Sequence, residues 1–326
     1  MGGRQRSTRV RRPASWRAYD EARLLELDTA SGAIRTVLSY TSRPEHVPPQ
    51  GGSHVFMAGS WDGDTLLLCT RTEVVRFDPR RERVVEVLSH PWMNDVHHVC
   101  RVAGRLHVVS TGLDAVLVLD DGGAVVESIS ATEAPVFAAR DRGVDYRRIP
   151  SMKPHAVHPN FVFERDGLRW VTRLHPGDAL CLDERSRRIS LADAPVHDGV
   201  AVGGARWFTT VPGELLRVDA GGDGVGVDAV AQRVDLASLG GPHTAPPLGW
   251  CRGVAFDGDL AFVGFSRLRP TPIKQNLRWL RKPLGKPDEA APTRLVAYDL
   301  AGGGHVATWE LEDAGVQGVF GVVVGR

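Results

Sequence analysis

HHVCRVAG, RLHVVSTG, DAVLVLD and GAVVESIS, which lie between His97 and Ser130, are four short runs in which apolar and polar residues alternate. Turn residues such as Gly and Asp separate the runs. Alternation of this kind between turn residues predicts β-strands rather than helices. Four consecutive strands in one unit are typical of a blade of a β-propeller.

The same unit recurs along the chain. Its innermost strand starts with one of six segments: SHVF (53–56), HHV (97–99), HPNFVF (158–163), HDGVAV (197–202), CRGVAF (251–256) and VQGVFGV (316–322). Six units predict an all-β, six-bladed β-propeller with four-stranded blades. Seven blades is the alternative, because residues 130–155 and 221–249 are long enough to hold additional strands.

The two ends of the sequence complement each other. ARLLELDTASGAIRTVLSY (22–40) supplies two outer strands without an inner one, and VQGVFGVVVGR (316–326) supplies an inner strand without outer partners. Joining them completes one blade and removes exposed sheet edges. The sequence therefore predicts a composite N- and C-terminal closing blade.

The domain organisation follows from this repeat. Residues 1–18 are basic and are expected to form a disordered tail, residues 19–326 form one propeller domain, and residues 267–287 form a basic insertion within it. The formal net charge of +1 gives no general attraction to nucleic acid or to a membrane surface. No apolar run approaches the length of about 20 residues that spans a bilayer. Four scattered cysteines and an N-terminus unlike a secretory signal favour a cytoplasmic protein.

Three histidines occupy equivalent positions in successive units. Equivalent positions of propeller blades meet around the axis, so His98, His158 and His197 are expected to converge. Neutral imidazole is a common transition-metal ligand, and three protein nitrogens leave one coordination position open. We therefore predict a divalent transition metal, Zn, Fe or Mn, on these histidines, and no nucleotide cofactor. The alternative for each histidine is a hydrogen bond to a neighbouring carbonyl.

Arg252 and Gln317 occupy the corresponding positions on the other side of the ring. The planar guanidinium of Arg252 suits a carboxylate or phosphate of a substrate. Its alternative partner is a buried aspartate such as Asp198 or Asp95. The predicted substrate-binding residues are His54, Asn160, Trp250, Arg252, Gln317 and Lys274.

Two segments that precede inner strands, PWMNDVHH (91–98) and MKPHAVHPN (152–160), bring carboxylate, amide and imidazole groups to the same face. Such groups can act as a general base or orient metal ligands. The predicted catalytic residues are Asp95, His97, His155 and Arg252. The alternative for Asp95 and Asn94 is that they only form a turn.

The insertion RLRPTPIKQNLRWLRKPLGKP (267–287) breaks the repeat. Its Leu277, Leu280 and Leu284 are spaced as one face of a short helix, and its basic residues include Lys274. Three roles remain open for it: a lid over the channel, a surface for an anionic partner, or a dimer contact.

Five segments carry a resemblance to a known family: NDVHHV, STGLDAVLVLD, KPHAVHPNFVF, HDGVAV and LGWCRGVAF. With these segments the chain resembles a family of uncharacterised bacterial proteins related to strictosidine synthase-like and gluconolactonase-like six-bladed propellers. The resemblance covers about residues 90–285 and implies the fold, but no settled activity. Gluconolactonases hold their central metal with Glu, Asn and Asp. This sequence has His at those ring positions, which argues against calcium and lactone hydrolysis.

We therefore predict an enzyme with a histidine-lined central channel. It would act on a small polar or anionic metabolite by metal-dependent hydrolase, lyase or isomerase chemistry. The alternative is a non-catalytic propeller that binds a small ligand or a partner protein through the same face.

Overall fold

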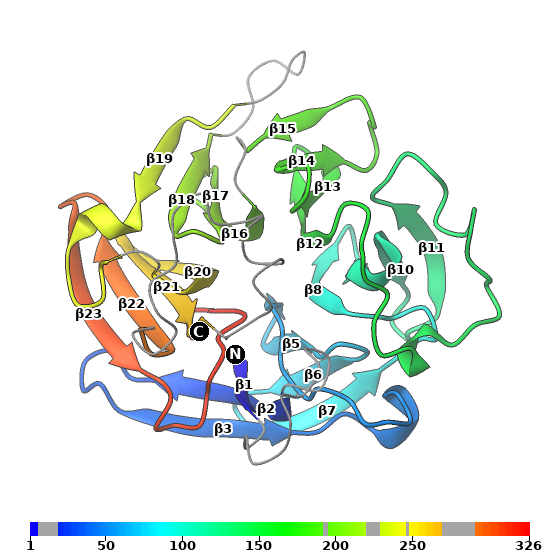
Figure 1. The fold of residues 1–326 in the computed structure, drawn as a ribbon, viewed down its shortest axis with the longest axis horizontal. Helices are drawn as coiled ribbons and strands as arrows, with labels where there is room; N and C mark the ends of the chain where they lie inside the picture. The colour runs from blue at the N-terminus through cyan, green and yellow to red at the C-terminus, as the bar shows by residue number, and fades with distance from the viewer. Residues whose placement is uncertain (6–18, 192–194, 220–228, 246–247, 269–290) are drawn as a thin grey trace.

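The computed structural model describes residues 1–5, 19–191, 195–219, 229–245, 248–268 and 291–326. Six antiparallel sheets surround a common centre, five with four strands and one with three (Figure 1). This arrangement confirms the predicted six-bladed β-propeller. No seventh sheet occurs in these ranges, because residues 130–155 contain a single 3-10 turn and residues 229–245 supply an outer strand.

Blades 1 to 3 follow one another along the chain, each with its first strand innermost. Their strands are β4 (Gly59–Asp62), β5 (Thr65–Cys69), β6 (Val74–Asp78) and β7 (Arg83–Leu88); β8 (Val96–Val102), β9 (Arg105–Ser110), β10 (Ala115–Leu119) and β11 (Val125–Ser130); β12 (Pro159–Arg165), β13 (Leu168–Arg173), β14 (Asp178–Cys181) and β15 (Arg188–Ser190).

Blades 4 and 5 repeat the pattern. Their strands are β16 (Val196–Val202), β17 (Ala205–Thr210), β18 (Glu214–Val218) and β19 (Gln232–Asp235); β20 (Trp250–Asp257), β21 (Leu260–Ser266), β22 (Arg294–Asp299) and β23 (Gly304–Glu310). The described helices are four short 3-10 turns: η2 (Pro44–His46), η3 (Thr111–Leu113), η4 (Tyr146–Arg148) and η5 (Leu236–Leu239).

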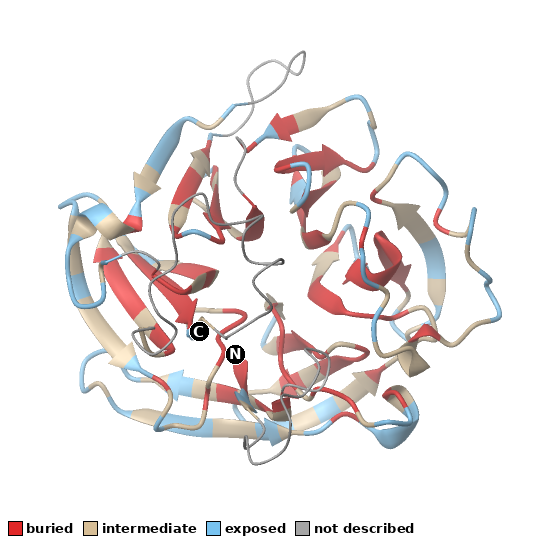
Figure 2. Cartoon of the chain, viewed as in Figure 1, coloured by how far each residue is buried: buried red, intermediate tan, exposed pale blue. Residues whose placement is uncertain are grey.

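The hydrophobic core lies between neighbouring blades. Leu67 of β5 belongs to the same buried cluster as Leu106 of β9 and Leu117 of β10. Middle strands are apolar on both faces and are buried, whereas outer strands such as β11 are partly exposed (Figure 2). Burial on both faces fixes the middle strands, and this rigid frame positions the loops near the axis.

The inner strands of blades 2 to 5 share one irregularity. Each has a β-bulge close to its first residue: between Val96 and His98 in β8, Pro159 and Val162 in β12, Val196 and Gly199 in β16, and Cys251 and Val254 in β20. A bulge adds one unpaired residue and changes the direction of the side chains beside it. Four equivalent bulges therefore re-aim side chains at the same place in four successive blades.

The closing blade joins both ends of the chain, as predicted, but its strands differ from the prediction. Residues 316–326 form an isolated bridge instead of the expected inner strand, and the N-terminal residues supply an unexpected strand. β1 (Gly2–Gln5) pairs with β2 (Tyr19–Leu27), which pairs with β3 (Ile34–Tyr40). Residues 316–326 run beside β1, with a bridge between Gly2 and Val319 and a hydrogen bond from the Gly3 N–H to the Gly318 carbonyl.

The expectation that residues 1–18 form a disordered tail is therefore wrong for residues 2–5; residues 6–18 lie outside the described ranges. Glycine gives little sequence signal for a strand, but the close approach here requires it. A Cβ on Gly2 would lie 2.1 Å from the Gly318 carbonyl oxygen.

The basic insertion is described only at its start. The Arg267 guanidinium forms hydrogen bonds of 2.6 and 2.7 Å with the Glu312 carboxylate. Residues 269–290, which include Lys274 and the predicted short helix, lie outside the described ranges.

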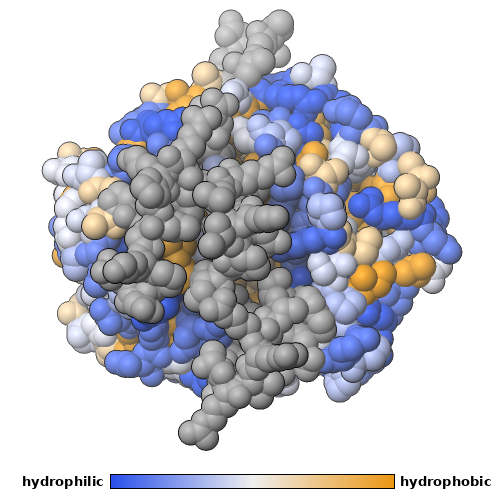
Figure 3. Space-filling view, viewed as in Figure 1, coloured by the Kyte–Doolittle hydropathy of each residue, from blue (hydrophilic) through white to orange (hydrophobic). Residues whose placement is uncertain are grey.

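The surface facing the viewer in Figure 3 is mainly hydrophilic where it is coloured, and its hydrophobic residues form small separate groups. In the described part of the chain, no helix has the length and apolar character needed to cross a membrane.

Candidate functional site

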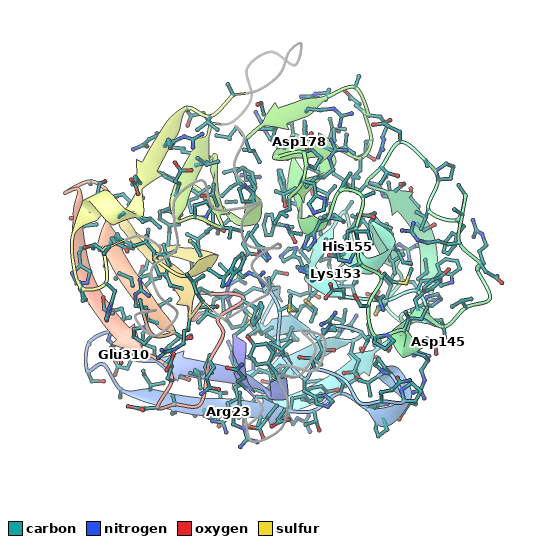
Figure 4. All side chains as sticks on the ribbon, in the orientation of Figure 1. Arg23, Asp145, Lys153, His155, Asp178 and Glu310 are labelled. Carbon is teal, nitrogen blue, oxygen red and sulfur yellow. The ribbon has the colours of Figure 1, made fainter. Side chains whose placement is uncertain are left out.

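Four imidazoles meet where the inner strands of blades 2, 3 and 4 begin. The ring centroid of His97 lies 5.1 Å from that of His158 and 5.6 Å from that of His197. His155 joins them, with its centroid 4.8 Å from His158 and an Nδ1–Nδ1 distance of 2.9 Å. Figure 4 shows His155 nearer to the middle of the disc than Asp145 at its rim. We call His97, His155, His158 and His197 the histidine cluster.

His98 does not join this cluster, contrary to the sequence prediction. Its ring packs 4.3 Å from the ring of Phe161, and its Nδ1 accepts the Val162 N–H at 3.4 Å. The physical reason is the bulge in β8, where His97 is the extra residue. The bulge interrupts the alternation of side chains, so His97 takes the axial place expected for His98.

A buried aspartate holds His158 in place. The Asp114 carboxylate accepts the backbone N–H groups of Ala156, Val157 and His158 at 2.8, 3.0 and 2.9 Å. His158 itself has a φ of 54°, an unusual conformation for a residue with a side chain. Such backbone conformations persist only where their surroundings enforce them, and they concentrate at functional sites.

Burial keeps the clustered imidazoles neutral. It lowers the pKa of His97 to about 3, and nearby Arg252 acts in the same direction. Burial is also the main cause that lowers the pKa of His158 and of His197. Neutral imidazoles carry a free lone pair that can bind a metal, whereas a pKa of about 3 makes His97 a weak proton acceptor.

Asp95 is paired rather than free. Its Oδ1 lies 2.9 Å from an Nη atom of Arg71, and its backbone carbonyl accepts the Nδ1–H of His97 at 2.7 Å. Burial opposes ionisation of Asp95, but the nearby Arg71, together with His97, Lys153 and His155, outweighs burial and holds the pKa of Asp95 well below its usual range. Asp95 therefore orients His97 and supplies a fixed negative charge. His155 Nε2 is 3.9 Å from Asp95 Oδ2.

Arg252 lies in the bulge of β20, half-buried, with its guanidinium carbon 4.9 Å from the centre of the Phe320 ring. It has no hydrogen bond or ion pair within 4 Å to any residue in the described ranges, and its Nε is buried. The predicted alternative, an ion pair with Asp198 or Asp95, is therefore not formed. The charges of Asp198 and Asp95 still act on Arg252 and favour its charged form, whereas burial opposes it.

Three of the other predicted substrate-binding residues, His54, Gln317 and Asn160, are already bonded within the chain. The backbone N–H of Ser42 donates to His54 Nδ1, and the backbone N–H of Gln5 donates to Gln317 Oε1. Asn160 is fully buried and donates its Nδ2–H to the Val196 carbonyl between two blades. Trp250 is half-buried at the start of β20. Lys274 lies outside the described ranges.

Sequence reasoning did not assign a site role to four residues that shape this region: Arg71, Asp114, Asp198 and Phe320. Asp198 could have been found, because it directly follows His197 in the HDG motif. Asp114 and Phe320 gave no local signal, since their roles depend on contacts between distant blades.

The described side chains do not form a ready metal centre. No group of three or more His, Cys, Asp or Glu residues in these ranges is placed to hold a metal ion. A cavity of about 570 Å³ borders the closing blade, with Leu24, Phe77 and Val316 in its lining, and none of the predicted site residues line it.

No protein-family model matches the chain, and no curated protein matches its sequence. Solved structures match its fold. A protein of unknown function from Bacteroides caccae has a TM-score of 0.57 at 9% identity, over 93% of this chain and 94% of that one. The Pan2 WD40 domain of Neurospora crassa has a TM-score of 0.46 at 10% identity, over 78% of this chain. Virginiamycin B lyase from Staphylococcus aureus has a TM-score of 0.44 at 12% identity, over 74% of this chain and 69% of that one.

The chain spans 65% of the length of the Pan2 structure, and also of a matching hydrazine synthase structure from Kuenenia stuttgartiensis. At identities this low, the similarity shows the propeller fold alone. Function must be argued from the site.

Proposed function

We propose that this protein is an enzyme that acts on a small polar or anionic metabolite at the histidine cluster, by hydrolase, lyase or isomerase chemistry. One observation carries the proposal: neutral, buried imidazoles lie close to Arg252, a half-buried cation without a bonded partner among the described residues. The guanidinium binds a carboxylate or phosphate of the substrate, and an imidazole beside it moves a proton.

The test is anion binding by wild-type protein and by Arg252→Lys. Lysine keeps the charge but loses the planar fork, so we expect affinity for the best small carboxylate or phosphate to fall by about 1–3 kcal/mol. Arg294→Lys is the matched control, because Arg294 lies in the same blade with its guanidinium carbon 4.7 Å from the Phe265 ring centre. A panel of acetate, inorganic phosphate and small dicarboxylates, followed by calorimetry, provides the measurement. Equal affinities in wild type and Arg252→Lys, or no binding of any anion, would reject the proposal.

We also propose that the protein binds a divalent transition metal, Zn, Fe or Mn, with a ligand set that differs from the one predicted from the sequence. His97 replaces His98, so the ligands would be His97, His158 and His197. Three imidazoles on one tetrahedral zinc, with Zn–N distances of about 2.0–2.1 Å, have ring centroids about 5 Å apart. The two distances from the His97 ring, 5.1 Å to His158 and 5.6 Å to His197, are close to this value. The rings would have to turn for their nitrogens to converge. Elemental analysis of untagged protein tests this: stoichiometric metal that disappears in His97→Ala but persists in His98→Ala supports these ligands.

A non-catalytic propeller that binds a small ligand or partner protein is the second candidate. It is favoured by the lack of a metal-holding group among the described side chains. It predicts anion binding at Arg252 without turnover of any bound metabolite.

We also propose that the chain is related to the strictosidine synthase-like and gluconolactonase-like propellers. We further propose a cytoplasmic location, because Cys69, Cys100, Cys181 and Cys251 are all free thiols. Disulfides form mainly in oxidising compartments.

A further inference from the structure

Asp198 is a buried carboxylate held between two blades next to the histidine cluster. It follows His197 in the bulge of β16 and is 3% exposed. Its Oδ2 accepts the Gly253 N–H of blade 5 at 2.7 Å, and its own backbone N–H donates to Thr209 Oγ1 at 3.1 Å. These bonds fix the carboxylate, so its second oxygen has a defined direction.

That second oxygen contacts His197. Asp198 Oδ1 lies 3.1 Å from His197 Nδ1. A carboxylate is only an acceptor, so a lone pair on Nδ1 at this distance would be repelled, whereas an N–H would be attracted. The contact therefore favours the tautomer with the proton on Nδ1. His197 Nδ1 and Asp198 Oδ1 are not aligned as a full hydrogen bond, so this preference rests on their short distance, and Nε2 has no hydrogen-bond partner among the described residues.

We propose that Asp198 is a positioning residue that fixes the tautomer of His197 and thereby keeps the lone pair of Nε2 free. This inference deepens the proposed function, because that lone pair is the group that His197 would offer to a ligand at the site. The tautomer itself does not depend on the proposed function.

Asp198→Asn is a sharp test because the hydrogen bond from the Gly253 N–H fixes the orientation of the asparagine amide. The Gly253 N–H needs an acceptor, so the amide oxygen stays on it and the NH₂ group faces His197 Nδ1. Nδ1 must then accept a hydrogen bond, which moves the ring proton to Nε2 and removes the lone pair from the histidine cluster. In serine proteases, an aspartate-to-asparagine change next to the catalytic histidine likewise leaves that histidine in the wrong tautomer.

The measurement is the tautomer itself, from long-range ¹H–¹⁵N imidazole spectra of ¹⁵N-labelled protein, with His197→Gln used for assignment. We expect an Nδ1–H tautomer for His197 in wild type and an Nε2–H tautomer in Asp198→Asn. His97 and His107 are internal controls, because their Nδ1–H groups donate to the carbonyls of Asp95 and Arg105. Asp120→Asn, at an exposed turn, is the matched control variant.

An Nε2–H tautomer in wild type, or an unchanged tautomer in Asp198→Asn, would overturn the inference. If the variant fails to fold, the wild-type tautomer alone decides. Because this readout needs no ligand, its outcome is separate from that of the anion-binding test on Arg252.

Discussion

The guanidinium carbon of Arg252 lies 4.9 Å from the centre of the Phe320 ring, which links the inner strand of blade 5 to the C-terminal segment that closes the propeller. Phe320 also packs edge-on against Tyr19 at 5.6 Å, and its backbone N–H donates to the Met1 carbonyl at 3.0 Å. The aromatic ring that supports the cation is therefore fixed by the closing blade. Closure of the ring and the orientation of Arg252 are consequently connected.

Phe320→Leu should weaken anion binding without removing the cation. A cation–π interaction with an aromatic face stabilises a neighbouring guanidinium by about 0.5–2 kcal/mol. Its loss leaves the Arg252 side chain less well ordered before the anion binds. We expect a decrease in anion affinity of about 2- to 30-fold, measured by calorimetry. Phe265→Leu, which removes the ring beneath Arg294, is the control and should bind the anion as wild type does. Equal losses in both variants would point to a general loss of stability.

Asp114→Ala should destabilise the fold and loosen the histidine cluster. The change leaves three backbone N–H groups, those of residues 156–158, without their carboxylate acceptor. We expect the free energy of unfolding to fall by about 2–4 kcal/mol in urea titrations, because unsatisfied buried donors are costly. Asp114→Asn should lie between this variant and wild type, since one amide oxygen can accept some of the bonds. A stability equal to wild type in Asp114→Ala would mean that the turn does not depend on this carboxylate.

Stability should fall in mild acid, and His98 should account for part of the fall. Burial lowers the pKa of His98 to about 4, whereas an unfolded histidine titrates near 6.5. Between these values the unfolded chain binds a proton that the folded protein excludes, so the free energy of unfolding decreases as the pH falls from about 6.5 to about 4. The full contribution is on the order of 3 kcal/mol.

His98→Asn tests this contribution, because an amide oxygen can replace Nδ1 as the acceptor of the Val162 N–H. The variant should lose stability less steeply than wild type as urea titrations are repeated from pH 7 to pH 4. His243→Asn is the control, since His243 is exposed and its φ of 60° is tolerated by asparagine. Parallel curves for wild type and His98→Asn would contradict the expected proton linkage.

The repeat pattern predicts the propeller well because each blade carries its own alternation and turns. It fails at His97 and His98 for a definite reason. Alternation predicts side-chain direction only while the strand pairing is regular, and the bulge in β8 adds one residue at that point. The existence of a histidine site could thus be predicted from sequence, but the choice between two adjacent histidines could not.

Contacts between blades are the second feature that could not be predicted from the sequence. Gln317 was placed on the ring by its position in the repeat, yet its Oε1 accepts the Gln5 N–H at 2.7 Å and helps to hold the closing blade together. Asp198 was considered only as a partner of Arg252, whereas it bonds to Gly253 in the next blade. Such roles depend on residues more than 50 positions away in the sequence, where no local pattern reports them.

Gly318→Ala should weaken ring closure. A Cβ at Gly318 would lie 2.1 Å from the Tyr19 hydroxyl oxygen, and Tyr19 is only 3% exposed, so its ring has little room to move. Overpacking of this kind costs about 1–3 kcal/mol. We expect a lower melting temperature, together with weaker anion binding, because Phe320 beneath Arg252 packs against the same tyrosine. Gly325→Ala is the matched control, since a Cβ at Gly325 meets no atom within 4 Å. A Gly318→Ala protein that melts and binds anions as wild type does would show that closure and the Arg252 site are independent.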